Sequence, residues 1–221
     1  MDNPPTELSP AIQTPAEEKW NSITHGIGAV LSIAALSLLV TLAGLRGGAM
    51  LVVTVSLFGA SLVMMYLVST WYHACRNDRH KGRLQVLDHL MIYGLIAGTY
   101  SPFLLVMIGG GWGWSLFGVL WGLALAGVIF KLLMGARFEL VSTVIYIAMG
   151  WAGLIAARPF WDALPAGAVA LILAGGVAYT AGVGFFLWER LPFNHTIWHG
   201  FVMAGSAFHV LAVLQYVVLG P

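Results

Sequence analysis

Long apolar stretches, separated by short clusters of charged residues, make up most of this chain. The stretches without Asp, Glu, Lys or Arg cover residues 20–45, 47–75, 89–130, 140–157, 163–188 and 191–221. A helix needs about 20 apolar residues to cross the hydrocarbon core of a bilayer. Five of these stretches therefore predict one membrane-spanning helix each.

The stretch over 89–130 is too long for a single span. Its 42 residues would form a helix of about 63 Å, at about 1.5 Å per residue, which is twice the thickness of a bilayer core. The segment 109–114 reads GGGWGW; its glycines break a helix, and its tryptophans suit a membrane interface. The stretch therefore predicts two helices, which brings the total to seven. The alternation of polar and apolar residues typical of β-barrel strands is missing from segments such as 118–130.

The composition agrees with a membrane protein. Charged residues make up 9% of the chain, against about 25% in a soluble domain, and the mean hydropathy is +0.87. Such a chain lacks the polar side chains to cover a soluble globule, and its net charge of +1 offers no basic patch to nucleic acid. A single cysteine, Cys75, excludes an internal disulfide and a cysteine-rich zinc module. The predicted fold class is an all-α integral membrane protein with seven transmembrane helices.

The basic residues predict the orientation of the chain. With a cytoplasmic N-terminus, eight Lys and Arg side chains lie inside and only two, Arg46 and Arg158, lie outside. Positive charge favours the cytoplasmic side, so we expect the N-terminus inside and the C-terminus outside. Residues 1–19, rich in proline and acidic residues, predict a short disordered cytoplasmic tail before a transmembrane domain over 20–221.

Histidines gather at one predicted depth of this domain. The cytoplasmic helix ends carry five of the seven histidines, together with one carboxylate, and these residues come from four helices. They are His25, His73, His89, His195, His199 and Asp88. Ionisable groups inside a membrane segment are costly and are candidates for function.

Three of the histidines predict a zinc site. His195 and His199 are four residues apart, so they share a helix face and can reach one metal ion. In a soluble helix this spacing is most often surface decoration, but His73 at the same depth adds a third ligand. Three imidazoles leave one position of a tetrahedral zinc open, as in catalytic sites, where a bound water becomes a usable nucleophile. We expect one zinc ion per chain.

Asp88 and Ser69 are the candidate catalytic residues beside this metal. Asp88 could act as a base or as an orienting partner for the attacking water; alternatively, it only faces the dipole at the start of its helix. Ser69 precedes His73 by four residues and shares its face, although its hydroxyl could equally bond to its own helix. His25, His89 and His209 are candidate partners of the ligands, with an interhelical hydrogen bond favoured for His25 and His209. Cys75 points to another side of its helix than His73.

These residues resemble the progestin and adipoQ receptor family, in particular its bacterial hemolysin III-like branch. The resemblance rests on residues 69–73 (STWYH), 87–89 (LDH) and 194–199 (NHTIWH), and on 18–28 and 98–102. It implies zinc bound by His73, His195 and His199 near the cytoplasmic face, with Asp88 and Ser69 beside it. Animal members are hormone receptors that look like ceramidases. Bacterial members carry a historical hemolysin label and a link to membrane homeostasis.

Three functions remain open at this point. The first is a zinc-dependent intramembrane hydrolase of a lipid amide or ester, and the second is a lipid or ligand sensor with structural zinc. The third is a pore-forming cytolysin, which the nearly apolar outer half of the chain disfavours. In each case we expect a multi-pass protein of the bacterial inner membrane whose partner is a membrane lipid.

Overall fold

The computed structural model describes residues 13–135 and 138–220, and within them all regular secondary structure is helical, without strands. The helices are α1 (Pro15–Arg46), α2 (Ala49–Ala74), α3 (Asp78–Pro102), α4 (Gly110–Met134), α5 (Glu139–Gly150), α6 (Ala157–Ala163), α7 (Ala166–Phe186) and α8 (Asn194–Ala212). Short π-helical or 3₁₀ segments extend three of them: Phe103–Ile108 after α3, Ala152–Ala156 between α5 and α6, and Val213–Val218 after α8. Together they form seven segments long and apolar enough to cross a membrane, which confirms the predicted fold class.

Helix α1 begins earlier than the sequence analysis predicts. Thr14 caps it: the Thr14 hydroxyl accepts from the backbone N–H of Glu17, and the Glu17 carboxylate accepts from the backbone N–H of Thr14. Pro15 follows at the first helical position, where its missing N–H costs nothing. Residues 15–19 of the predicted tail therefore belong to α1. Residues 13 and 14 precede the helix, and the remaining residues of the predicted tail, 1–12, lie outside the described residues.

The long apolar stretch folds back at the predicted glycines. Gly109 and Gly110 have φ of 61° and 53°, a left-handed conformation that glycine adopts without steric cost. The π-helical end of α3 stops there, and α4 starts in the opposite direction. The prediction of two helices in this stretch is confirmed.

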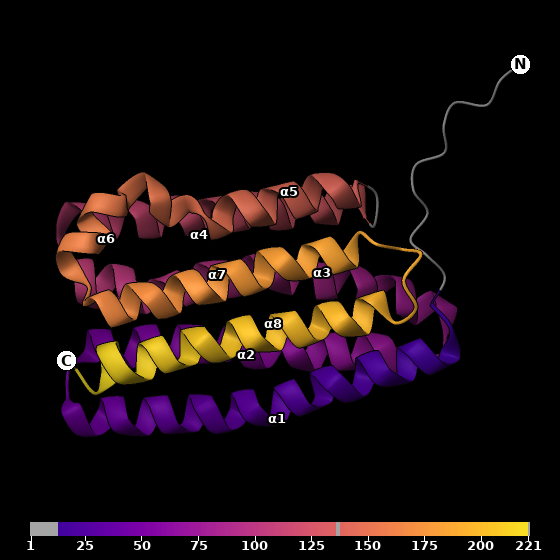
Figure 1. Ribbon diagram of the computed structural model, residues 1–221, viewed down its shortest axis with the longest axis horizontal. Coiled ribbons are helices and arrows are strands. Elements are labelled where there is room, and N and C mark those ends of the chain that lie inside the picture. Colours follow the sequence, from indigo (N-terminus) through magenta and orange to yellow (C-terminus); the bar gives the residue numbers. More distant parts are fainter. Residues whose placement is uncertain (1–12, 136–137, 221) are drawn as a thin grey trace, which may run out of the picture.

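The helices run side by side along one long axis (Figure 1). Helix α1 packs on α2 and on α8, and α8 packs on α7, while α2 packs on α3 and α3 on α4. Since the number of spans is odd, α1 begins at one end of the bundle and α8 leads the chain to the other. We call the end at which α1 begins the amino-terminal face; α2 ends and α8 begins there. Which side of a membrane it meets stays a prediction.

Polar and apolar side chains are distributed as a lipid environment requires. Large apolar side chains point outward, with Leu45 exposed to 81% and Ile155 to 78%. The interior holds the following buried polar or charged residues: Asn21, His25, Ser32, Thr54, Ser69, His73, Asp88, Thr99, Ser101, Lys131, Ser142, Thr143, His199, Ser206 and His209. A group that cannot face hydrocarbon must find partners inside the bundle. The interior polar groups are therefore the place to look for function.

Candidate metal centre

Three histidines from two helices meet at the amino-terminal face. His73 lies in the last turn of α2, and His195 and His199 lie in the first two turns of α8. One nitrogen from each ring lies within 4.8 Å of the other two. The ring centroid of His73 is 5.0 Å from that of His195 and 5.1 Å from that of His199. The structure thus brings together the three residues that the sequence analysis assigns to the metal.

Each of the three rings has one nitrogen without a hydrogen-bond partner among the described residues. The Nε2 atoms of His73, His195 and His199 are all buried and make no hydrogen bond within the described residues. A buried polar atom without a partner costs about 1–3 kcal/mol. Imidazole nitrogens are good ligands for zinc and related cations, and a single ion would satisfy all three. The donor set therefore fits a bound transition-metal ion.

The far nitrogens of two ligands are held by α1. Nδ1 of His73 lies 2.7 Å from Oε2 of Glu18, and Nδ1 of His199 lies 3.2 Å from the hydroxyl of Thr24. A carboxylate can only accept, so Nδ1 of His73 carries the proton and its Nε2 keeps a free lone pair for a metal. Such outer partners fix the tautomer and orientation of metal-binding histidines.

Other residues of α1 tie the first turn of α8 to the same end of the bundle. The backbone N–H of Phe193 donates to the Glu17 carboxylate at 2.9 Å. The hydroxyl of Thr196 donates to Oδ1 of Asn21 at 2.5 Å. No sequence pattern assigned these α1 residues, or Glu18 and Thr24, to the site. The Thr-x-x-Glu capping pattern at 14–17 was the available signal that the helix starts there.

Asp88 and Ser69 lie outside the group of three histidines and line a cavity together. Both side chains are buried, and the cavity has a volume of about 360 Å³. His25 lines the same cavity near this end, and beyond it the wall is mostly apolar. The apolar wall is formed by Met65, Ile92, Leu95, Ile96, Phe103, Ile147, Leu154, Ile172, Leu173, Val183, Phe186 and Val202, among others. An acyl lipid has a polar group and a long apolar chain, and a cavity with a polar end and an apolar body matches both.

The remaining histidines have separate surroundings. His25 stacks on His199 with ring centroids 3.4 Å apart, and neither of its nitrogens has a hydrogen-bond partner among the described residues. The interhelical hydrogen bond predicted for His25 is therefore wrong, because its ring packs face to face with a candidate ligand instead. Nε2 of His89 lies 3.6 Å from Glu139. His209 stacks on Tyr179 at 5.6 Å, far along α8, and its Nδ1 has no partner there.

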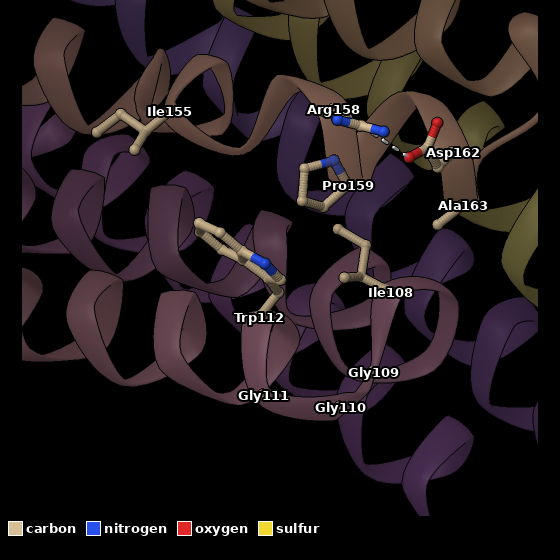
Figure 2. Close-up of a pocket in the computed structure, with 10 residues that line it drawn as sticks. All are labelled: Ile108, Gly109, Gly110, Gly111, Trp112, Ile155, Arg158, Pro159, Asp162 and Ala163. Atoms are coloured by element: carbon tan, nitrogen blue, oxygen red, sulfur yellow. Dashed lines mark ion pairs between the residues drawn. The ribbon is translucent and has the colours of Figure 1, made fainter.

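A second hollow lies at the opposite end of the bundle (Figure 2). It has a volume of about 610 Å³ and lies between the Gly109–Gly111 turn and α6. Its charged residues are Arg158 and Asp162, 3.7 Å apart, with exposed side chains. Its lining among the described residues includes no histidine and no buried polar side chain, so it offers no comparable chemistry.

Known proteins are similar to this chain over most of its length. The family model described as "Haemolysin-III related" matches residues 13–210. The chain is 47% identical to "Hemolysin-3" of Bacillus cereus over 202 residues, which cover 91% of this chain and 92% of that protein. It is 43% identical to the "Hemolysin-3 homolog" of Bacillus subtilis (strain 168), over 93% of this chain and 96% of that protein. A more distant relative, "Monocyte to macrophage differentiation factor" of Homo sapiens, is 27% identical over 76% of this chain and 72% of that protein. The chain therefore belongs to the Haemolysin-III related family of multi-pass membrane proteins.

Proposed function

We propose that this protein is a zinc-dependent intramembrane hydrolase that cleaves an amide or ester bond of an acyl lipid. The observation that carries the proposal is the convergence of three histidines whose Nε2 atoms are buried and have no hydrogen-bond partner among the described residues. His25, which stacks on His199, lines a largely apolar cavity next to them. His73, His195 and His199 would hold the zinc ion. Bound there, zinc supplies a Lewis acid that polarises a carbonyl group and activates water at neutral pH.

Two residues of the chain provide the remaining chemistry. The carboxylate of Asp88 lies at the polar end of the cavity, where it would take the proton of the attacking water and return it to the leaving group. The hydroxyl of Ser69, beside Asp88, would donate a hydrogen bond to the substrate carbonyl oxygen as negative charge develops on it. These roles need an acid–base group and a hydrogen-bond donor near the scissile bond, and both residues line the same cavity.

The shape and lining of the cavity support an acyl lipid as the class of substrate. An acyl chain would lie along the apolar residues and exclude water from the polar end, while its carbonyl group would face Asp88 and Ser69. Contacts between the chain and the apolar wall would add dispersion attraction, because a lipid tail already lies in hydrocarbon and gains nothing from removal from water. A small polar ester or amide lacks this contribution and would be a poor substrate.

Pore formation, which the name of the Bacillus relatives suggests, is the less favoured function. A conducting path needs polar groups along its length. In the described part of the chain the cavity becomes mostly apolar beyond the Asp88 end, which suits a lipid tail rather than ions.

A hydrolysis screen tests the proposal. Purified protein would be incubated with fluorescent N-acyl amides and acyl esters before and after treatment with a chelator, and again after zinc is restored. We expect turnover of at least one long-chain substrate, its loss with the chelator and its return with zinc. A stoichiometric metal content without turnover of any acyl lipid would instead favour a sensor with structural zinc.

A further inference from the structure

We infer that Glu18 is a positioning residue of the metal centre: it fixes the orientation and protonation of His73 from a helix that contributes no ligand. The inference rests on the metal-binding part of the proposed function. It concerns residue 18, which the sequence analysis places in a disordered tail and which the structure places in the first turns of α1.

The geometry is specific to one carboxylate and one ring nitrogen. Oε2 of Glu18 lies 2.7 Å from Nδ1 of His73, and the other ring nitrogen, Nε2, is buried without a hydrogen-bond partner among the described residues. Nε2 is therefore the nitrogen left to bind a metal together with His195 and His199. With the Nδ1 proton donated to Glu18, the imidazole can only offer its Nε2 lone pair to the metal. If that contact were absent, the ring could rotate or carry its proton on Nε2, and both changes oppose metal binding.

A lysine holds the other oxygen of the same carboxylate. Nζ of Lys81 lies 2.8 Å from Oε1 of Glu18. Lys81 is itself fixed, because Nζ lies 3.4 Å from the backbone oxygens of Tyr72 and Cys75 and 4.8 Å from the centre of the Tyr72 ring. Tyr72 and Cys75 lie on either side of His73 in the sequence, so these contacts attach Lys81 to the end of α2 that carries His73. Glu18 is thus held in one rotamer by the segment that follows its histidine partner.

The charge of Glu18 matters as well as its shape. A carboxylate that accepts from Nδ1 makes the imidazole more basic and a stronger ligand, and loss of such a partner commonly lowers metal affinity about tenfold to hundredfold. Glutamine at this position could still accept the Nδ1 proton through its amide oxygen, but it has no negative charge and forms no ion pair with Lys81. The expected order of metal affinity is therefore wild type, then Glu18→Gln, then Glu18→Ala.

The test measures metal affinity directly. Metal-free wild type, Glu18→Gln and Glu18→Ala would be titrated with zinc against a chelator of known affinity, and with Co²⁺ while its visible absorption is recorded. Thr14→Ala is the matched control: it removes the cap of the same helix but touches no histidine. The melting temperature of each protein would be measured with zinc and with excess chelator.

We expect Glu18→Ala to bind zinc about tenfold to hundredfold more weakly, with an altered Co²⁺ spectrum and a smaller zinc-induced rise in melting temperature. Glu18→Gln should recover part of the affinity, and Thr14→Ala should bind zinc like wild type. If Glu18→Ala binds as tightly as wild type, or no more weakly than Thr14→Ala, the inference is wrong while the metal centre stands. If wild type binds neither ion, both the metal centre and the inference fail.

Discussion

The hydroxyl of Thr24 on α1 lies 3.2 Å from Nδ1 of His199 on α8. The same hydroxyl lies 2.9 Å from the backbone oxygen of Trp20 and 3.0 Å from that of Asn21. A hydroxyl has one proton, which it donates to a backbone oxygen, so its own oxygen remains to accept a proton from Nδ1. This contact leaves Nε2 of His199 free for a metal, as Glu18 does for His73.

Thr24→Val should therefore weaken metal binding with little change of shape. Valine keeps the branched side chain but cannot accept the Nδ1 proton, so we expect zinc affinity to fall by about tenfold. Thr24→Ser retains the hydroxyl and should bind like wild type. A chelator titration of the three proteins checks this. Equal affinity of Thr24→Val and wild type would show that the hydroxyl does not orient His199.

The three histidines should determine both metal content and stability. His73→Ala, His195→Ala and His199→Ala each remove one of three ligands, so elemental analysis should find well below the one zinc per chain expected of wild type. Their melting temperatures should fall as well, because a bound ion joins α2 to α8 in the folded state only. His80→Ala, which changes an exposed histidine, is the control. Wild-type metal content in all three variants would show that the ligands are misassigned.

The close approach of α1 to α2 at Gly28 leads to a prediction about the stability of the fold. A Cβ atom at Gly28 would lie 2.6 Å from the ring of Tyr66, and Tyr66 is held by its hydrogen bond to Ser206 at 2.8 Å. Gly28→Ala should destabilise the fold by about 1–3 kcal/mol, the usual cost of overpacking a core. Gly44 lies on the same helix, and a Cβ atom added there would have no packing contact within 4 Å. Gly44→Ala should therefore be neutral or stabilising. Thermal or denaturant unfolding of both variants in detergent measures the difference. Equal stability of the two would contradict the described packing.

The predicted orientation of the chain in the membrane can be tested with reporter proteins placed at the two ends of the bundle. A reporter fused after Pro221 and one inserted in the 76–83 loop should report opposite compartments, with the loop in the cytoplasm, because eight of ten basic residues fall on its predicted side. Paired alkaline phosphatase and green fluorescent protein fusions measure this. The same compartment for both would overturn the predicted topology.

The sequence was sufficient to predict the features that depend on one helix at a time. Seven spans follow from the length of the apolar stretches, and the turn at Gly109 and Gly110 follows from a run of glycines. The pair His195 and His199 follows from helical spacing. Glu18 could not be assigned in this way, because its contact with His73 joins residues 55 positions apart. The stacking of His25 on His199 likewise depends on how α1 docks against α8, and no local pattern encodes that docking.

The central claim is that zinc and Asp88 together perform hydrolysis. The most direct test is to measure zinc content and acyl-lipid hydrolysis side by side for wild type, Asp88→Asn and His199→Ala. Asparagine keeps the shape of Asp88 but cannot accept a proton, so we predict near-normal zinc in Asp88→Asn with turnover reduced about 10²–10⁴-fold, whereas His199→Ala loses both. If Asp88→Asn hydrolyses lipid at the wild-type rate, or loses zinc as completely as His199→Ala, then Asp88 is not the acid–base group and the account is contradicted.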